Sequence, residues 1–120
     1  MPVEVVVGVG ATSAATVTEC LDAIDRVVRP EWLLVGLSTL DRKRSLIERV
    51  AATLGVPWSV WSAEALERLD VPNPSTLSSA AVGSASVAEA AAILGSRGGR
   101  LVREKVAAGG VTVAVACVAD

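Results

Sequence analysis

The chain has 120 residues, of which 52% are hydrophobic, and its 13 acidic and 11 basic side chains give a net charge of −2. This length predicts one domain with one core over residues 1–120, and the negative charge argues against a general nucleic-acid binder, which needs many phosphate contacts. Because histidine is missing, the usual general base near neutral pH and the commonest metal ligand are missing too. We expect neither a metal site nor a cofactor.

The sequence lacks the signals of membrane and secreted proteins. No stretch reaches the roughly 18 uninterrupted apolar residues that span a bilayer, and the start Met1-Pro2-Val3-Glu4 lacks the basic region of a secretory signal. Cys20 and Cys117 are too few and too far apart in sequence to indicate a disulfide framework. We therefore expect a cytoplasmic protein with two buried thiols and no membrane partner.

The first half of the chain alternates between predicted strands and helices. A β-branched run over 3–9 predicts a strand covered on both faces, followed by a Gly8-Val9-Gly10 turn and a helix over 13–28. Further predictions are a strand over 32–38, a helix over 41–54 that ends at Gly55, a strand over 57–61, and a helix over 63–69 capped by Ser62. This order predicts three consecutive βα units.

The second half begins with Pro72 and Pro74, which exclude regular structure at their positions. Ser86 and Glu89 have the spacing of a capping box, so a helix is predicted from Val87 to Leu94. Strands over 101–105 and 111–118 are predicted around a Gly109-Gly110 turn. Three βα units followed by this antiparallel pair predict a three-layer α/β/α sandwich around a mixed sheet of about five strands.

The segment from Gly8 to Ser13 is the first candidate for ligand binding. The glycines Gly8 and Gly10 permit close approach, and free amides at a helix start, with Thr12 and Ser13, can hold a carboxylate or phosphate. The third glycine position of a dinucleotide fingerprint holds Ser13, so that motif is absent. A plain βα turn explains the segment equally well.

The second candidate is the segment 39–44, directly after the second predicted strand. Polar side chains there, including Thr39, Asp41, Arg42 and Lys43, would face the crevice where open α/β sheets bind ligands. The alternative is that Asp41 is an N-cap and the following bases form a solvated helix face.

Two further features have two interpretations each. The prolines on both sides of Asn73 fix its backbone, so that its amide can contact a ligand or simply complete a turn. Strand alternation would put Arg103 and Lys105 on one face, as a local positive charge for a polycarboxylate or as ordinary surface bases.

For Trp58 and Trp61 we expect packing in the core rather than against a ring ligand.

Six features of the sequence occur together in a characteristic order. They are the Gly-x-Gly stretch, a Thr-x-Asp-x-Lys pattern at Thr39, Asp41 and Lys43, Val71-Pro72-Asn73-Pro74-Ser75, Ser86-Val87-Ala88-Glu89-Ala90-Ala91, Lys105, and Gly109-Gly110-Val111-Thr112-Val113-Ala114-Val115-Ala116. In these segments, which extend over nearly the whole chain, the protein resembles the CobE / CbiG C-terminal-domain family of cobalamin (vitamin B12) biosynthesis.

The resemblance implies that the protein binds a precorrin or cobalt-precorrin, a tetrapyrrole with several acetate and propionate side chains, as an accessory or carrier domain. In this interpretation Thr12, Ser13, Asn73 and Ser75 hydrogen-bond the carboxylates, and Arg42, Lys43 and Lys105 neutralise them. Relatives often carry arginines where Thr12 and Ser13 stand, and Pro-Lys-x-Lys where this chain has Glu104-Lys105-Val106-Ala107, so two anion contacts are replaced.

Two alternatives follow from the same resemblance. The first is a cobalt-precorrin-5A hydrolase-like component that opens a lactone and releases acetaldehyde, with Asp41 or Glu64 as general base and Lys43 polarising the carbonyl. The second is a non-catalytic subunit that contacts other cobalamin-biosynthesis enzymes.

Overall fold

A computed structural model describes residues 3–69 and 84–119, and its elements alternate as the sequence predicts. In chain order they are β1 (Val3–Ala11), α1 (Val17–Val27), β2 (Trp32–Leu40), the 3-10 helix η1 (Asp41–Lys43), α2 (Arg44–Leu54), β3 (Trp58–Trp61), α3 (Ala63–Glu67), α4 (Ser84–Gly95), β4 (Leu101–Ala108) and β5 (Val111–Cys117).

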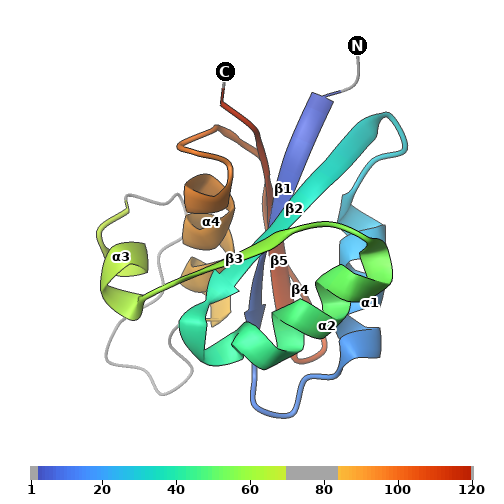
Figure 1. Cartoon of the computed structure of the whole chain (residues 1–120), viewed down its shortest axis with the longest axis vertical. Helices are drawn as coiled ribbons and strands as arrows, with labels where there is room; N and C mark the ends of the chain where they lie inside the picture. Colours follow the sequence, from blue (N-terminus) through green and yellow to red (C-terminus); the bar gives the residue numbers. More distant parts are fainter. Residues whose placement is uncertain (1–2, 70–83, 120) are drawn as a thin grey trace.

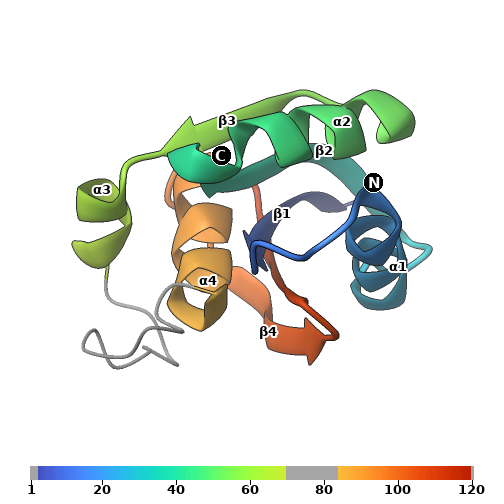
Figure 2. The same cartoon turned by 90° about the horizontal axis from the view of Figure 1, so that it is seen from below.

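The strands form one mixed sheet in the order β3-β2-β1-β5-β4. Strands β1, β2 and β3 run parallel, and β5 runs antiparallel to both β1 and β4. Helices α1 and α2 cover one face of the sheet, and α4 covers the other with α3 beside it (Figures 1 and 2). The structure thus confirms the three-layer α/β/α sandwich around a five-stranded mixed sheet.

The two faces of the sheet are packed in different ways. On the α1–α2 face, the branched side chains of Val5, Val7 and Val9 meet both helices in the larger core cluster. On the α4 face, the cluster consists of Ala88 and Ala92 of the helix and small strand residues beneath them. Small residues on this face let the helix lie unusually close to the sheet.

Gly8 is the point of closest approach between α4 and β1. A β-carbon added to Gly8 would lie 2.0 Å from the carbonyl oxygen of Ala88 and 2.5 Å from the amide nitrogen of Ala92. Both neighbours are helix backbone, which cannot rotate away as a side chain can. Glycine at position 8 is therefore required by the contact between helix and sheet.

The expected turn at Gly8-Val9-Gly10 is wrong, because β1 continues through these residues to Ala11. Gly8 lies inside the sheet, opposite Ser38 of β2 and Ala114 of β5. A glycine pair between a strand and a helix predicts a turn from local sequence, but here the glycine serves a tertiary contact.

Helix α1 begins at Val17 rather than at the expected Ser13. Thr16 is its N-cap: the amide of Glu19 donates to the Thr16 hydroxyl at 3.1 Å, and the amide of Thr16 donates to the Glu19 carboxylate at 3.0 Å. This reciprocal capping box satisfies two otherwise unpaired amides and determines where the helix starts.

Helix α4 begins at Ser84, before the expected start at Val87. Ser86 therefore lies inside the helix rather than at its N-cap, and the expected helix start at Val87 is wrong. Asp41 is likewise not an N-cap, because it opens η1 after the N-cap residue Leu40.

Other local predictions are confirmed. Gly55 ends α2 in the left-handed conformation with φ of 71°, and the amide of Ala65 donates to the N-cap hydroxyl of Ser62 at 3.1 Å. The Gly109-Gly110 turn joins an antiparallel pair, with β4 three residues longer than expected. Pro72 and Pro74 lie outside the described residues, among which no helix is long and apolar enough to span a bilayer.

Replacing Gly8 with alanine tests the close approach of α4. We expect Gly8→Ala to lower the free energy of unfolding by about 3 kcal/mol, at the upper end of the usual cost of overpacking, because the helix must move off the sheet. Gly36→Ala is the matched control in β2, since its added carbon would meet its nearest atom at an ordinary 3.6 Å. Urea denaturation measures both, and equal losses in the two variants would contradict the contact.

A second prediction concerns Cys20, which is buried in the core, whereas Cys117 is half-buried. Burial, with a smaller contribution from the Glu19 carboxylate, raises the pKa of the Cys20 thiol from 9.0 to about 11. The unfolded chain then ionises first, so stability should fall between about pH 9 and pH 11, by roughly 2–3 kcal/mol. Cys20→Ala should lack this part of the decline in pH-dependent denaturation; an unchanged slope would show that Cys20 is not responsible.

Candidate functional site

The parallel strands β1, β2 and β3 end at the same edge of the sheet, at the bottom of Figure 1. We call this the carboxyl edge and define it by the segments that meet there: Ala11–Ser13, Leu40–Lys43, Trp61–Glu64 and the Gly109-Gly110 turn. The hairpin turn reaches this edge because β5 starts opposite Ala11. In open α/β sheets, ligands bind at this edge.

Helix α4 points its N-terminus toward the carboxyl edge. Ala88 lies over Gly8, whereas Gly95 at the other end of the helix lies beside Val6, closer to the start of β1. The partial positive charge of a helix N-terminus is thereby directed to the same edge as the loops.

Thr12 and Ser13 form an exposed loop that the β4–β5 turn supports. The amide of Thr12 donates to the carbonyl of Gly110 at 2.9 Å, and the carbonyl of Thr12 accepts from the amide of Ala15 at 3.1 Å. A β-carbon on Gly110 would lie 2.7 Å from the Thr12 hydroxyl oxygen. The backbone of this loop is therefore held, while both hydroxyl-bearing residues remain accessible.

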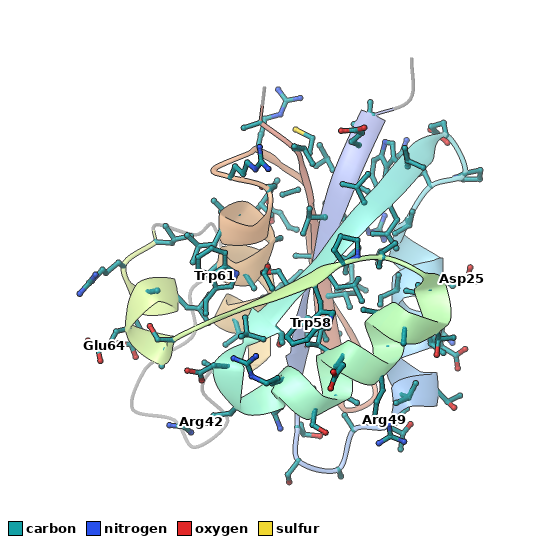
Figure 3. The ribbon with its side chains drawn as sticks, in the orientation of Figure 1. Asp25, Arg42, Arg49, Trp58, Trp61 and Glu64 are labelled. Atoms are coloured by element: carbon teal, nitrogen blue, oxygen red, sulfur yellow. The ribbon has the colours of Figure 1, made fainter. Side chains whose placement is uncertain are left out.

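Basic residues follow β2 at the same edge. Arg42 is exposed and Lys43 is half-buried in η1, and Figure 3 shows Arg42 at the bottom of the molecule. The next base has a different environment, because the guanidinium of Arg44 lies 5.5 Å from the ring centre of Trp58. The Arg42–Arg44 run is thus divided between the carboxyl edge and the packing of α2.

Three predicted site residues lie inside the sheet instead. Gly8 and Gly10 are buried strand residues, so their amides are not at a helix start. Thr39 is 1% exposed, and its hydroxyl donates to the carbonyl of Val9. The structure gives these three residues roles in strand pairing and packing.

Lys105 lies on the edge strand β4 and is half-buried. The pairing of β4 with β5 shifts register on both sides of Arg103, so the alternation that would put Arg103 and Lys105 on one face is interrupted. The backbone amide of Lys105 donates to the carboxylate of Glu89 at 3.0 Å. Lys105 is therefore set back from the carboxyl edge, next to α4.

Sequence reasoning did not identify Glu89 as a site residue. Its carboxylate is fully buried in a helix whose neighbouring residues, from Val87 to Ala92, are otherwise apolar. That contrast was visible in the sequence and indicates a buried charge with a specific partner.

The two candidate bases, Asp41 and Glu64, are both exposed at the carboxyl edge, and Figure 3 shows Glu64 on α3. Within residues 3–69 and 84–119, the Asp41 carboxylate forms no ion pair with Lys43. Asn73 and Ser75 lie outside these residues. Their ligand contacts stay predictions.

The tryptophans are the first and last residues of β3, and they pack against different core clusters. Trp58 packs against the cluster on the α1–α2 face, and Trp61 packs toward α4 (Figure 3). The indole N–H of Trp61 donates to the buried hydroxyl of Ser38 at 2.8 Å. Both rings are half-buried, as expected for residues that hold the edge strand β3 to the sheet.

Two cavities lie away from the carboxyl edge. One of about 390 Å³ is lined by Val6, Gly36 and Trp58 among others, and one of about 560 Å³ lies between α1, Trp32 and Leu54. Among the described side chains, no group of three or more Cys, Asp or Glu residues is arranged to hold a metal ion.

Comparison with known proteins identifies the class of this domain. The family model described as "Cobalamin synthesis G C-terminus" matches residues 5–116. The chain belongs to this CbiG C-terminal family, and it is a cobalamin biosynthesis protein of the CbiG/CobE type. The resemblance inferred from the sequence motifs is thus confirmed.

Solved structures of the family have the same fold. Cobalamin biosynthesis protein chiG from Agrobacterium tumefaciens is 28% identical with a TM-score of 0.70, over 97% of this chain and 99% of that one. CobE, a protein from the cobalamin (vitamin B12) biosynthetic pathway, is 25% identical with a TM-score of 0.75, over 99% of this chain and 93% of that one.

A longer protein contains the same fold. A cobalamin biosynthesis protein G homolog from Sulfolobus solfataricus is 20% identical with a TM-score of 0.73, and the match covers 99% of this chain but 38% of that one. Among curated proteins, none matches this chain.

The role of Thr39 can be tested by stability alone. We expect Thr39→Val to lower the free energy of unfolding by about 1–2 kcal/mol, because the buried carbonyl of Val9 loses its donor. Thr12→Val makes the same chemical change at an exposed position and should change stability by less than about 0.5 kcal/mol. If denaturation gave equally small effects for both variants, the Thr39 hydroxyl would not be needed within the sheet.

Proposed function

We propose that this protein binds a precorrin or cobalt-precorrin intermediate at the carboxyl edge, as an accessory or carrier component of corrin-ring assembly. Membership in a cobalamin biosynthesis family supports the pathway. The observation that carries the site is the grouping of Arg42 and Lys43 with the accessible hydroxyls of Thr12 and Ser13 at the edge to which α4 directs its N-terminus.

These groups suit a macrocycle with carboxylates around its rim. Hydrogen bonds between a cation and a carboxylate are among the stronger ones in proteins, and partial burial of Lys43 lessens the screening by water. The Thr12–Ser13 loop follows β1, whereas Arg42 and Lys43 follow β2. Groups on separate segments can contact separate carboxylates of one ring.

Lys105 supplies a further cation from β4, the edge strand at the opposite end of the strand order from β3. It lies near the level of Gly8 and is half-buried. The backbone of Lys105 contacts α4, so a ligand carboxylate that extends along α4 from the carboxyl edge would come near this residue. We therefore retain Lys105 as a ligand contact, with Asn73 and Ser75 as proposed hydrogen-bond donors.

The carrier role is favoured over catalysis by the surroundings of the two candidate bases. The carboxyl edge carries two cations, Arg42 and Lys43, and two carboxylates, Asp41 and Glu64. Both carboxylates are exposed, in water-rich surroundings that provide little preorganisation for a general base. Acetaldehyde released from a lactone-bearing precursor, and lost in Asp41→Asn or Glu64→Gln, would instead establish the hydrolase-like alternative.

The proposed cations are tested with the double variant Lys43→Ala/Lys105→Ala. In absorbance titrations with a corrin that carries free peripheral carboxylates, we expect its dissociation constant to rise at least about tenfold, with a weaker dependence on salt. The matched control is Arg26→Ala/Arg49→Ala, which removes two exposed charges from α1 and α2. Figure 3 shows Arg49 on α2, away from Arg42.

Two results would count against the proposal. Equal loss of affinity in both double variants would mean that net charge, rather than the named cations, attracts the ligand. Unchanged affinity in Lys43→Ala/Lys105→Ala would remove both lysines from the site.

A further inference from the structure

Glu89 is a charged residue in the tightly packed layer between α4 and the sheet. It is 0% exposed, and the flanking residues Ala88 and Ala90 are 0% and 1% exposed. A carboxylate in such surroundings is stable only when hydrogen bonds replace the water that it has lost. One of these bonds comes from the backbone amide of Lys105, 3.0 Å from a Glu89 carboxylate oxygen.

Strand β4 has an irregular register at Lys105, the residue whose amide Glu89 accepts. Arg103 pairs with Val115, and Val106 pairs with Val113. Two residues of β4, Glu104 and Lys105, therefore stand opposite the single residue Ala114, which is the arrangement of a β-bulge. A bulge removes a backbone amide from the ladder and redirects the side chains of its residues. Here the carboxylate of Glu89 accepts the amide of Lys105.

The position of Glu89 is itself determined by the contact of α4 with β1. Because the helix backbone at Ala88 touches Gly8, α4 has little freedom to slide or lift. Glu89 follows Ala88 directly and joins the edge strand from this position. A buried carboxylate of α4 thus holds the backbone of β4 at Lys105. If the register of β4 shifted by one residue here, the Lys105 side chain would move to the other face of the sheet.

We propose that Glu89 is a positioning residue: by accepting the amide of Lys105, it holds the bulge of β4 and with it the Lys105 ammonium in the orientation that binds a ligand carboxylate. The ligand part of this inference rests on the proposed function. Since Glu89 acts through the backbone of Lys105, its contribution to binding requires the Lys105 side chain.

The matched variants are Glu89→Met and Glu89→Gln. Methionine fills a similar volume but offers only a weak acceptor, whereas glutamine keeps a side-chain oxygen that can accept the Lys105 amide. Glu48→Gln, an exposed carboxylate on α2, is the control for loss of one charge.

Binding is measured with a cobalt-free corrin that carries free peripheral carboxylates. We expect Glu89→Met to raise the dissociation constant about as much as Lys105→Ala does, roughly tenfold, and Glu89→Gln to restore most of the affinity. In the Lys105→Ala background, Glu89→Met should have no further effect. Independent, multiplying effects of the two changes would overturn the inference, because Glu89 would then act elsewhere.

Hydrogen exchange of the Lys105 amide, followed by nitrogen-15 NMR, tests the positioning step without a ligand. We expect exchange to accelerate at least tenfold in Glu89→Met, and less in Glu89→Gln, with the amides of Val113 and Val115 unchanged. If Glu89→Met does not fold, the acceleration in Glu89→Gln relative to the wild type decides the question. Unchanged exchange at Lys105 overturns the inference, whereas accelerated exchange in a protein that binds no corrin overturns only the proposed function.

Discussion

The close packing of α4 on β1 is the constraint on which the rest of the structure depends. It requires glycine at position 8 and small residues at positions such as Ala88 and Ala92, because helix backbone meets strand backbone there. This contact limits how far the helix can move from the sheet. The N-terminal half of α4 lies over Gly8, toward the carboxyl edge, and its buried Glu89 accepts the amide of Lys105 on the edge strand.

The two layers around the sheet have different tasks as a result. Branched aliphatic side chains between the sheet and α1–α2 supply most of the apolar burial. The α4 layer packs small residues on the centre of the sheet, and its buried Glu89 accepts a backbone amide from the bulge of β4. Accessible groups on short loops, held by a rigid sheet, are the usual construction of a binding site in this class of fold.

Local sequence signals predicted the element order, the cap at Ser62 and the end of α2, because each depends on a few neighbouring residues. Thr16 and Glu19 have the Ser/Thr-x-x-Glu spacing and form the capping box of α1, whereas the buried carboxylate of Glu89 accepts the amide of Lys105 on β4. Likewise, the position of the candidate-site loops at the carboxyl edge was predictable from strand order. The sheet-bound hydroxyl of Thr39 and the bulge of β4 were not, since both depend on contacts between distant segments.

The most direct test of the account is to locate the bound ligand on the protein. Amide chemical shifts would be followed while a cobalt-free corrin with free peripheral carboxylates is added, and then repeated with a matched corrin whose carboxylates are converted to amides. The account predicts saturable shifts at Thr12, Ser13, Arg42, Lys43 and Lys105, and much weaker ones with the amide form. Shifts centred on the cavity between Trp32 and Leu54, or equal responses to both corrins, would contradict it.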